Sequence, residues 1–538
     1  MDPITLEVHW SRLIAIADEA ATALLRTAFS TIVRESNDFA TVLMDAEGHS
    51  VSENTGGIAS FSCILPRTTR ALLQRFPADS WRPGDVVITN DPWLATGHLP
   101  DITAVSPIFH RGRLVGFAGS IAHSPDVGGA LWGADCQEVF EEGIRIPPTR
   151  IIREGAWNHE VLELFLANVR VPRQVLGDLE AQVTANEVSA ARVAEFLADA
   201  GLPDLAELGA ALAERTDAAM RAAIAAVPDG EYHAVQEADG FDAEVTRICC
   251  TVRVSGDRME IDYSGTSPQV GRGINCVFNY THAYSVYPVK CALDPFTPRN
   301  EGSYRAIAVH APPGSILNPA FPAPVSARQL TGHLLAGAIY RALAPVLPDR
   351  IIADCGSAPS MRCLFSGLDR HGDRFSQVLF ASGGMGATPQ RDGLSTTAFP
   401  TNAGAGSIEA FEAVAPLVVW RKQFRPDSGG PGRFRGGLGQ EVEIEVRAPA
   451  PLRLSLLSDR RDHPALGVLG GKPGAPAEIL MSDGTRPHPK SRTMIAPGMR
   501  LIMRYPGGGG YGPPAERDPA ALAADLRDGV VTRPEDYR

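Results

Sequence analysis

The chain has 538 residues, of which 44% are hydrophobic and 21% charged, a composition typical of a globular protein with more than one core. Its net charge of -12 argues against binding to nucleic acid or to an anionic membrane, because both need a basic surface. No apolar run approaches the ~20 residues that span a bilayer, and the chain opens with no secretion signal. We therefore expect a cytoplasmic protein whose partners are small molecules or other proteins. The eight cysteines form no CxxC pair, which indicates reduced thiols.

The first part of the chain alternates between helix and strand signals. Apolar residues recur at spacings of three, four and seven between residues 3 and 34, which predicts a long helix. Short apolar runs at 39–44 and 85–89 predict strands, and the first of these is followed by a turn at 45–48. The second strand leads into the polar loop at 90–101.

A hairpin follows that loop. Residues 102–109 and 114–122 are rich in β-branched and apolar side chains, and residues 110–113 form a polar connection of hairpin length. With Phe109 opposite Leu114, the two runs form an antiparallel pair.

The hairpin register brings two histidines and a carboxylate together. It places Asp101 opposite Ala122, and His123 beside Pro100 and Asp101, within a residue or two of slip. His98, Asp101 and His123 therefore converge at one end of the hairpin. Imidazole nitrogens with a carboxylate oxygen suit Zn²⁺, Mn²⁺ or Fe²⁺, and three protein ligands leave a position for water or substrate. The alternative is a structural cluster in which the imidazoles donate to the carboxylate.

Further polar residues lie close to this candidate metal site in the sequence. Asn90 and Asp91 precede a proline and are expected to hold the loop through bonds to the backbone. A nearby acidic group could be a further ligand, or could accept a hydrogen bond from a metal-bound imidazole, and the sequence does not say which. The candidates are Glu138, Glu141 and Glu142, with Arg145 close by.

The remainder of the chain divides into a helical and a strand-rich part. Ala-, Leu- and Glu-rich segments bounded by Pro or Gly predict helices at 160–170, 174–200 and 204–227. Strands are expected within 231–264, and two helical segments within 275–345. Further short strands are predicted at 440–447, 452–457, 477–481 and 498–504.

Together these elements indicate a mixed α/β (α+β) fold, in which antiparallel hairpins and long helices are followed by a β-rich C-terminal part. We divide the chain into an α+β metal-site region, a helical region, a mixed α/β core region and a β-rich C-terminal region. Their bounds are 1–150, 151–230, 231–435 and 436–538, and the four could form one compact unit.

Three Gly-rich segments and one charged cluster have competing interpretations. Residues 382–386, 428–439 and 506–512 could cradle an anion with their backbone N–H groups, but none matches a nucleotide-binding fingerprint. Close approach of backbones is the better explanation. Residues 459–463 could face a substrate, but an ion-pair network is favoured.

Several segments together give a specific resemblance over nearly the whole chain. The sequence resembles the B subunit of the hydantoinase/oxoprolinase family, to which the subunits of ketone carboxylases are akin. The residues that carry the resemblance are Glu35-Ser36-Asn37-Asp38-Phe39, Pro83-Gly84-Asp85, Asn90-Asp91-Pro92, Gly97-His98-Leu99-Pro100-Asp101, Ala122-His123, Asp126-Val127-Gly128-Gly129, Glu142-Gly143-Ile144-Arg145, Asn168-Val169-Arg170, Gly177-Asp178-Leu179, Asp262-Tyr263-Ser264-Gly265-Thr266 and the Gly-rich segments at 428–439 and 506–512.

The resemblance implies a function and a partner. A hydantoinase A type subunit with ATP would phosphorylate the carbonyl of a cyclic amide, and this chain would hydrolyse the ring at a divalent transition metal (Zn, Mn or Fe). The assembly would be a hetero-oligomer such as α2β2. The metal ligands that the resemblance implies are Asp38, His98, Asp101 and His123. Asp126, three residues beyond His123, is our candidate general base, with a structural role as the alternative.

Two other functions compete with the hydrolase. The first is a subunit of an ATP-dependent ketone carboxylase, which the metal motif does not separate from a hydrolase, although the absence of a long extension favours the hydrolase. The second is a non-catalytic scaffold for the A subunit.

Overall fold

The structure is a computed structural model that describes residues 2–242 and 244–537. Its contacts group the chain into two compact units. Unit 1 holds Met1–Leu131, Phe140–Ala226 and Val277–Ala308, and unit 2 holds Trp132–Val139, Val227–Cys276 and Val309–Arg538. The expected mixed α/β fold with antiparallel sheets is confirmed. The division into four regions stays a prediction, since the two units describe contacts rather than regions of sequence. Among the described residues, no helix has both the length and the apolar character that a bilayer span requires.

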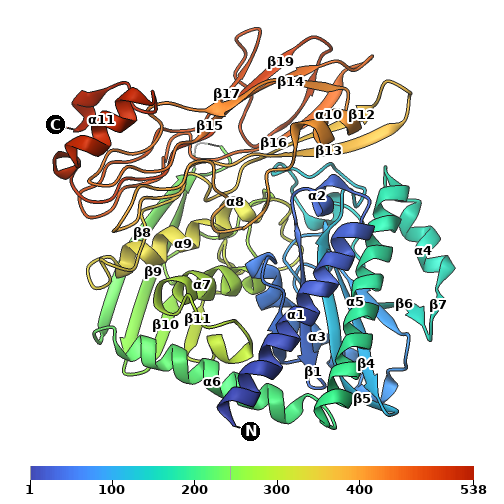
Figure 1. Cartoon of the computed structure of the whole chain (residues 1–538). Coiled ribbons are helices and arrows are strands. Elements are labelled where there is room, and N and C mark those ends of the chain that lie inside the picture. The colour runs from blue at the N-terminus through green and yellow to red at the C-terminus, as the bar shows by residue number, and fades with distance from the viewer. Residues whose placement is uncertain (1, 243, 538) are drawn as a thin grey trace. The chain divides into compact units, whose positions relative to one another are not determined.

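Unit 1 is built on a seven-stranded sheet with the order β2-β1-β5-β4-β3-β6-β7, in which every neighbouring pair is antiparallel. The strands are β1 (Phe39–Asp45), β2 (Ser50–Glu53), β3 (Val86–Thr89), β4 (Asp101–His110), β5 (Arg113–His123), β6 (Thr149–Arg153) and β7 (Ala156–Trp157). The helices are α1 (Pro3–Thr27), α2 (Thr31–Arg34), α3 (Ala59–Arg75), α4 (His159–Leu166), α5 (Pro172–Ala200), α6 (Ala206–Ala225) and α7 (Phe278–Leu293) (Figure 1).

Helices cover both faces of this sheet. On one face, α1 and α5 run side by side and pack against the sheet, and Ala118 of β5 belongs to their core cluster (Figure 1). The next residue, Gly119, points to the opposite face, because side chains alternate along a strand. A Cβ at Gly119 would lie 2.2 Å from Leu65 of α3. Helix α3 therefore packs on the second face, and the central strands are buried from both sides.

The sequence patterns located most of these elements but not α3. The predicted helix at 3–34 is two helices, α1 and α2, because the chain leaves the helical conformation at Ala28. Helix α3 carries an internal proline, Pro66, and buries apolar and polar residues alike. It has no amphipathic stripe because it packs between the sheet and α7, so the periodicity that reveals a surface helix is missing.

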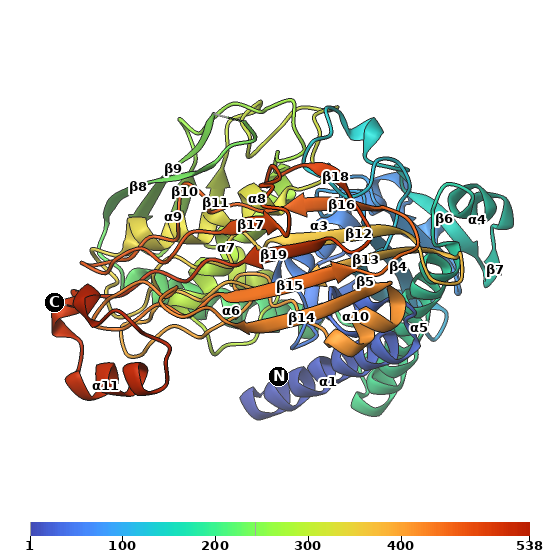
Figure 2. The same ribbon diagram turned by 90° about the horizontal axis from the view of Figure 1, so that it is seen from above.

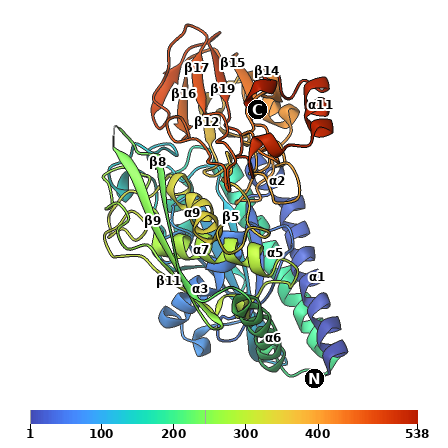
Figure 3. The same cartoon turned by 90° about the vertical axis from the view of Figure 1, so that its left-hand side faces the viewer.

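Unit 2 contains three four-stranded sheets with the orders β11-β10-β9-β8, β13-β12-β16-β18 and β14-β15-β19-β17. Helix α9 (Leu334–Leu343) packs against the long strands β8 and β9 of the first sheet (Figure 3). Strands of the third sheet lie side by side in Figure 2. The strands are β8 (Gly230–Asp239), β9 (Val245–Ser255), β10 (Arg258–Asp262), β11 (Ile307–His310), β12 (Arg362–Leu368), β13 (Arg374–Phe380), β14 (Leu417–Phe424), β15 (Gln440–Val446), β16 (Leu452–Leu457), β17 (Glu478–Met481), β18 (Arg492–Ile495) and β19 (Arg500–Arg504). The other helices are α8 (Gln329–Gly332), α10 (Ile408–Val414) and α11 (Pro519–Arg527).

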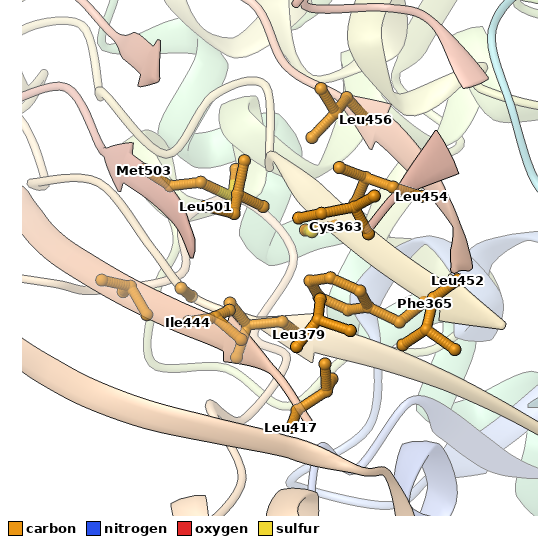
Figure 4. Close-up of a cluster of buried hydrophobic side chains, with 14 of the residues drawn as sticks. Cys363, Phe365, Leu379, Leu417, Ile444, Leu452, Leu454, Leu456, Leu501 and Met503 are labelled. Carbon is orange, nitrogen blue, oxygen red and sulfur yellow. The ribbon is translucent and has the colours of Figure 1, made fainter. Parts of the chain in front are cut away.

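The second and third sheets share one apolar core, shown in Figure 4. Cys363 and Phe365 of β12 alternate with outward-facing residues, as do Ile444 of β15 and Leu501 of β19. The predicted strands of the C-terminal part are present, but β12, β13 and β14 were not predicted. They pair with those strands, so the β-rich part draws on the chain from residue 362 onward.

The Gly-rich segments of unit 2 pack backbone against backbone, as expected. The Gly508 N–H donates to Gly437 O at 2.9 Å, and Gly508 O accepts from the Gly430 N–H at 2.8 Å. A Cβ at Gly508 would lie 2.1 Å from Met385 O, closer than any side chain tolerates. These glycines are therefore needed so that neighbouring segments can hydrogen-bond outside any regular sheet.

We expect Gly508→Ala to lower the free energy of unfolding by about 3 kcal/mol, because the methyl group separates two hydrogen-bonded segments. Chemical denaturation measures the difference. The control is Gly271→Ala in the same unit, where a Cβ would meet no atom within 4 Å. Equal stability of the two variants would contradict the close-packing explanation.

Candidate metal centre

The β4–β5 hairpin places the predicted residues with a shift of one position. Phe109 pairs with Leu114 as predicted, but a bulge follows between Ile108 and Phe109. The extra residue moves the rest of the register by one, so Asp101 lies opposite His123 rather than opposite Ala122. The bulge therefore brings the carboxylate and the imidazole into direct register.

His98, Asp101 and His123 form a tight, buried group. Asp101 Oδ1 lies 2.9 Å from His98 Nε2 and 2.9 Å from His123 Nδ1. The candidate ligand atoms all lie within 4.8 Å of one another. The three residues are 2%, 0% and 3% exposed. The convergence that the hairpin predicted is therefore present in the structure.

The geometry of the group fits a divalent ion. Ligand atoms that bind one ion at about 2.1 Å and at right angles lie about 3 Å apart, close to both observed contacts. His98 Nε2 makes no hydrogen bond with Asp101 despite the short distance, so a directed bond between the two does not explain the contact. Two neutral imidazoles and one carboxylate are also a donor set that Zn²⁺, Mn²⁺ and Fe²⁺ accept.

Asn90 ties the ligand loop to its surroundings, as the sequence suggested. Its amide donates to Leu99 O at 2.8 Å and to Ile144 O at 2.9 Å, and its oxygen accepts from the Ile146 N–H at 2.6 Å. Asn90 is fully buried, so each of these bonds satisfies a backbone group that water does not reach. The loop therefore enters and leaves the metal group at a defined place.

Asp38 lies beside the group, but its carboxylate is not a member of it. The His123 N–H donates to Asp38 O at 3.1 Å, so the two residues are neighbours through the backbone. The group of close ligand atoms is made of His98, Asp101 and His123 alone. The role of Asp38 as a fourth ligand stays a prediction.

The segment that leads to Asp38 is positioned by Asp178 of α5, a contact that the sequence did not predict. Its carboxylate accepts from the N–H groups of Phe29 and Ser30 at 2.8 and 3.0 Å, where α2 begins. Burial raises the pKa of Asp178, and these hydrogen bonds offset part of that rise. The signal in the sequence is a lone acid at a position of α5 that packs inward.

Asp126 is held by Arg170. One carboxylate oxygen lies 2.6 Å from Arg170 Nη1, and the other accepts from the backbone N–H of Arg170. The same guanidinium donates to the carbonyls of Gly128 and Gly129. General-base action by Asp126 stays a prediction, and these contacts favour the structural alternative. Arg170 belongs to a segment that carried the resemblance, but the sequence gave no sign of its contact with Asp126.

The other candidate residues have separate surroundings. Glu142 is buried, and Arg145 lies 3.6 Å from a carboxylate oxygen of Asp91. In unit 2, the cluster at 459–463 is an ion-pair network, as favoured from the sequence. Its contacts are Asp459 with Lys490, Arg460 with Asp354 and His463 with Asp239. All eight cysteines are free thiols, as expected.

Comparison with known proteins identifies the family. The family model described as hydantoinase B/oxoprolinase matches residues 2–514, so the chain belongs to this family. A protein from Pseudomonas sp. (strain NS671), named as the B subunit of a D-/L-hydantoinase, is 30% identical over 99% of this chain and 94% of its own length. The beta subunit of the caprolactamase of Pseudomonas jessenii is 30% identical over 99% of this chain and 94% of its own length.

Solved structures agree on the fold. The ATP-dependent caprolactamase from Pseudomonas jessenii has a TM-score of 0.91 and 28% identity, and the match covers 99% of this chain and 95% of that one. A nucleotide-free acetone carboxylase also has a TM-score of 0.91, at 20% identity, over 99% of this chain and 79% of that one. The second likeness concerns the fold alone.

We expect Arg170→Met to lower the free energy of unfolding by about 2–3 kcal/mol, because it leaves the buried Asp126 carboxylate without its cation. Adding Asp126→Asn should recover part of this loss, and chemical denaturation of the single and double variants measures the coupling. The exposed Arg173→Met, three residues further on, is the control and should change little. Additive effects of the two substitutions would contradict the proposed contact.

Proposed function

We propose that this chain is the metal-dependent B-type subunit of an ATP-dependent cyclic amidohydrolase, which opens a lactam or hydantoin ring. The observation that carries the proposal is the buried group of His98, Asp101 and His123 in a chain of the hydantoinase B/oxoprolinase family. The names of the two Pseudomonas relatives, one from a hydantoinase and one from a caprolactamase, support a cyclic amide as substrate.

The chemistry explains why two subunits would be needed. The carbonyl carbon of an amide is a poor electrophile, and phosphorylation of its oxygen makes that carbon open to attack and supplies a leaving group. We assign this ATP-dependent step to a hydantoinase A type partner, in a cytoplasmic hetero-oligomer such as α2β2. Both Pseudomonas relatives are named as one of several subunits, which supports the existence of a partner.

In this proposal, His98, Asp101 and His123 hold a divalent Zn, Mn or Fe ion, with Asp38 as a fourth ligand. When bound, such an ion lowers the pKa of a coordinated water toward neutrality. Asp101 is central to the arrangement because one of its oxygens contacts both imidazoles. Burial of all three side chains shields the group from bulk water, which strengthens its electrostatic interactions.

Removing one ligand tests the metal site. We expect the purified protein to contain a divalent transition metal, and His98→Ala to lose both the metal and the ring-opening activity of the complex with the A subunit. Elemental analysis and product formation measure the two effects. The control is His110→Ala, which changes a buried histidine at the other end of β4. A metal-free protein whose His98→Ala complex is fully active would leave the scaffold as the explanation.

A second measurement separates the two steps of the reaction. If the A subunit phosphorylates the substrate, the His98→Ala complex should still form ADP in the presence of a lactam or hydantoin, but no ring-opened product. Chromatography of nucleotides and products from one reaction measures both. ATP turnover that requires bicarbonate and a ketone, with none on lactams, would instead assign the chain to a ketone carboxylase.

A further inference from the structure

A short turn precedes the proposed metal ligand His98. The N–H groups of Leu94 and Ala95 donate to Asp91 O at 3.1 and 2.8 Å, so residues 91–95 form one helical turn, the Asp91–Ala95 turn. Like the end of a helix, such a turn leaves its last carbonyl groups without partners of its own. Their hydrogen bonds must come from other parts of the chain.

Two other helices of unit 1 supply these donors. The amide nitrogen of Asn279, near the start of α7, lies 3.4, 3.2 and 3.4 Å from the carbonyl oxygens of Trp93, Leu94 and Ala95. The hydroxyl of Thr68 on α3 also donates to Leu94 O, at 2.9 Å. The end of the turn is therefore capped by side chains from α3 and α7.

Arg67 sets the orientation of the Asn279 amide. Its Nε lies 3.1 Å from Asn279 Oδ1, and its guanidinium packs over the ring of Phe278, 5.9 Å from the centroid. A guanidinium only donates hydrogen bonds, so the amide oxygen must face Arg67 and the amide NH₂ must face the three carbonyls. The assignment of the amide thus follows from its neighbours.

We propose that Asn279 is a positioning residue that caps the Asp91–Ala95 turn and thereby places His98 against Asp101. Ala95 is only three residues from His98, so a change in the turn moves the ligand loop at its start. Asn90 holds the same loop near Leu99, and Asn279 provides the second point of attachment. The effect on metal binding rests on the function proposed above, whereas the effect on the turn does not.

The test uses two variants of the full chain. Asn279→Ala removes the amide, and Asn279→Asp keeps an acceptor for Arg67 but turns a carboxylate oxygen toward three carbonyl oxygens. We expect the Mn²⁺ Kd, measured by calorimetry, to rise about tenfold in the Ala variant and further in the Asp variant. The increase of Tm on adding Mn²⁺ should shrink accordingly, because it follows the ratio of metal concentration to Kd.

A second readout needs no metal. In the metal-free protein, amide hydrogen exchange of a peptide that covers residues 91–98 should be faster in both variants than in the wild type. Thr68→Val, which removes the other cap, should change exchange and Kd in the same direction.

The control reproduces a merely structural loss. Asn158 caps α4 by accepting from the Val161 N–H at 3.3 Å, so Asn158→Ala should lower the Tm of the metal-free protein. It should leave the Mn²⁺ Kd and the exchange of residues 91–98 unchanged.

The outcomes separate this inference from the proposed function. Unchanged exchange at residues 91–98, or a Mn²⁺ Kd within twofold of the wild type, would overturn the positioning role of Asn279. If the wild type binds no metal, the proposed function fails, and the exchange measurement alone decides whether Asn279 caps the turn.

Discussion

The arrangement of the candidate site depends on one pairing, that of Asp101 with His123 across the β4–β5 hairpin. Because the two residues are directly opposite, a single carboxylate oxygen contacts His123 and also the incoming loop at His98. A β-bulge sets this pairing, and a register shifted by one residue would turn every later side chain of one strand to the other face. The helices on both faces of the sheet keep the strands in this register.

Around this pairing, single polar side chains from distant segments hold the backbone of the ligand-bearing loops. Asn90 satisfies three buried backbone groups, Asp178 holds the start of α2, and Arg170 binds the loop after His123. Each of them pairs groups that burial would otherwise leave without a hydrogen bond. The site is therefore built less by its ligands than by the bonds that fix the loops carrying them.

Unit 2 solves a different packing problem. Its segments near Gly437 and Gly508 approach until a Cβ would collide with a carbonyl oxygen, and their backbones hydrogen-bond outside a regular sheet. The glycines that resemble an anion-binding loop in the sequence are thus explained by packing. A motif of small residues indicates close approach, but the sequence does not say whether a ligand or another segment fills the space.

The sequence by itself determined the local features: the hairpin, the residues at its end, most helices and strands, and the family resemblance. These follow from neighbouring residues, because side-chain alternation and turn chemistry are short-range properties. Only the tertiary structure decided the bulge, the course of α3, and contacts such as Phe29 with Asp178, which are 149 residues apart. Such contacts arise when separate elements pack together, and no periodic pattern in either segment records which partner it will meet.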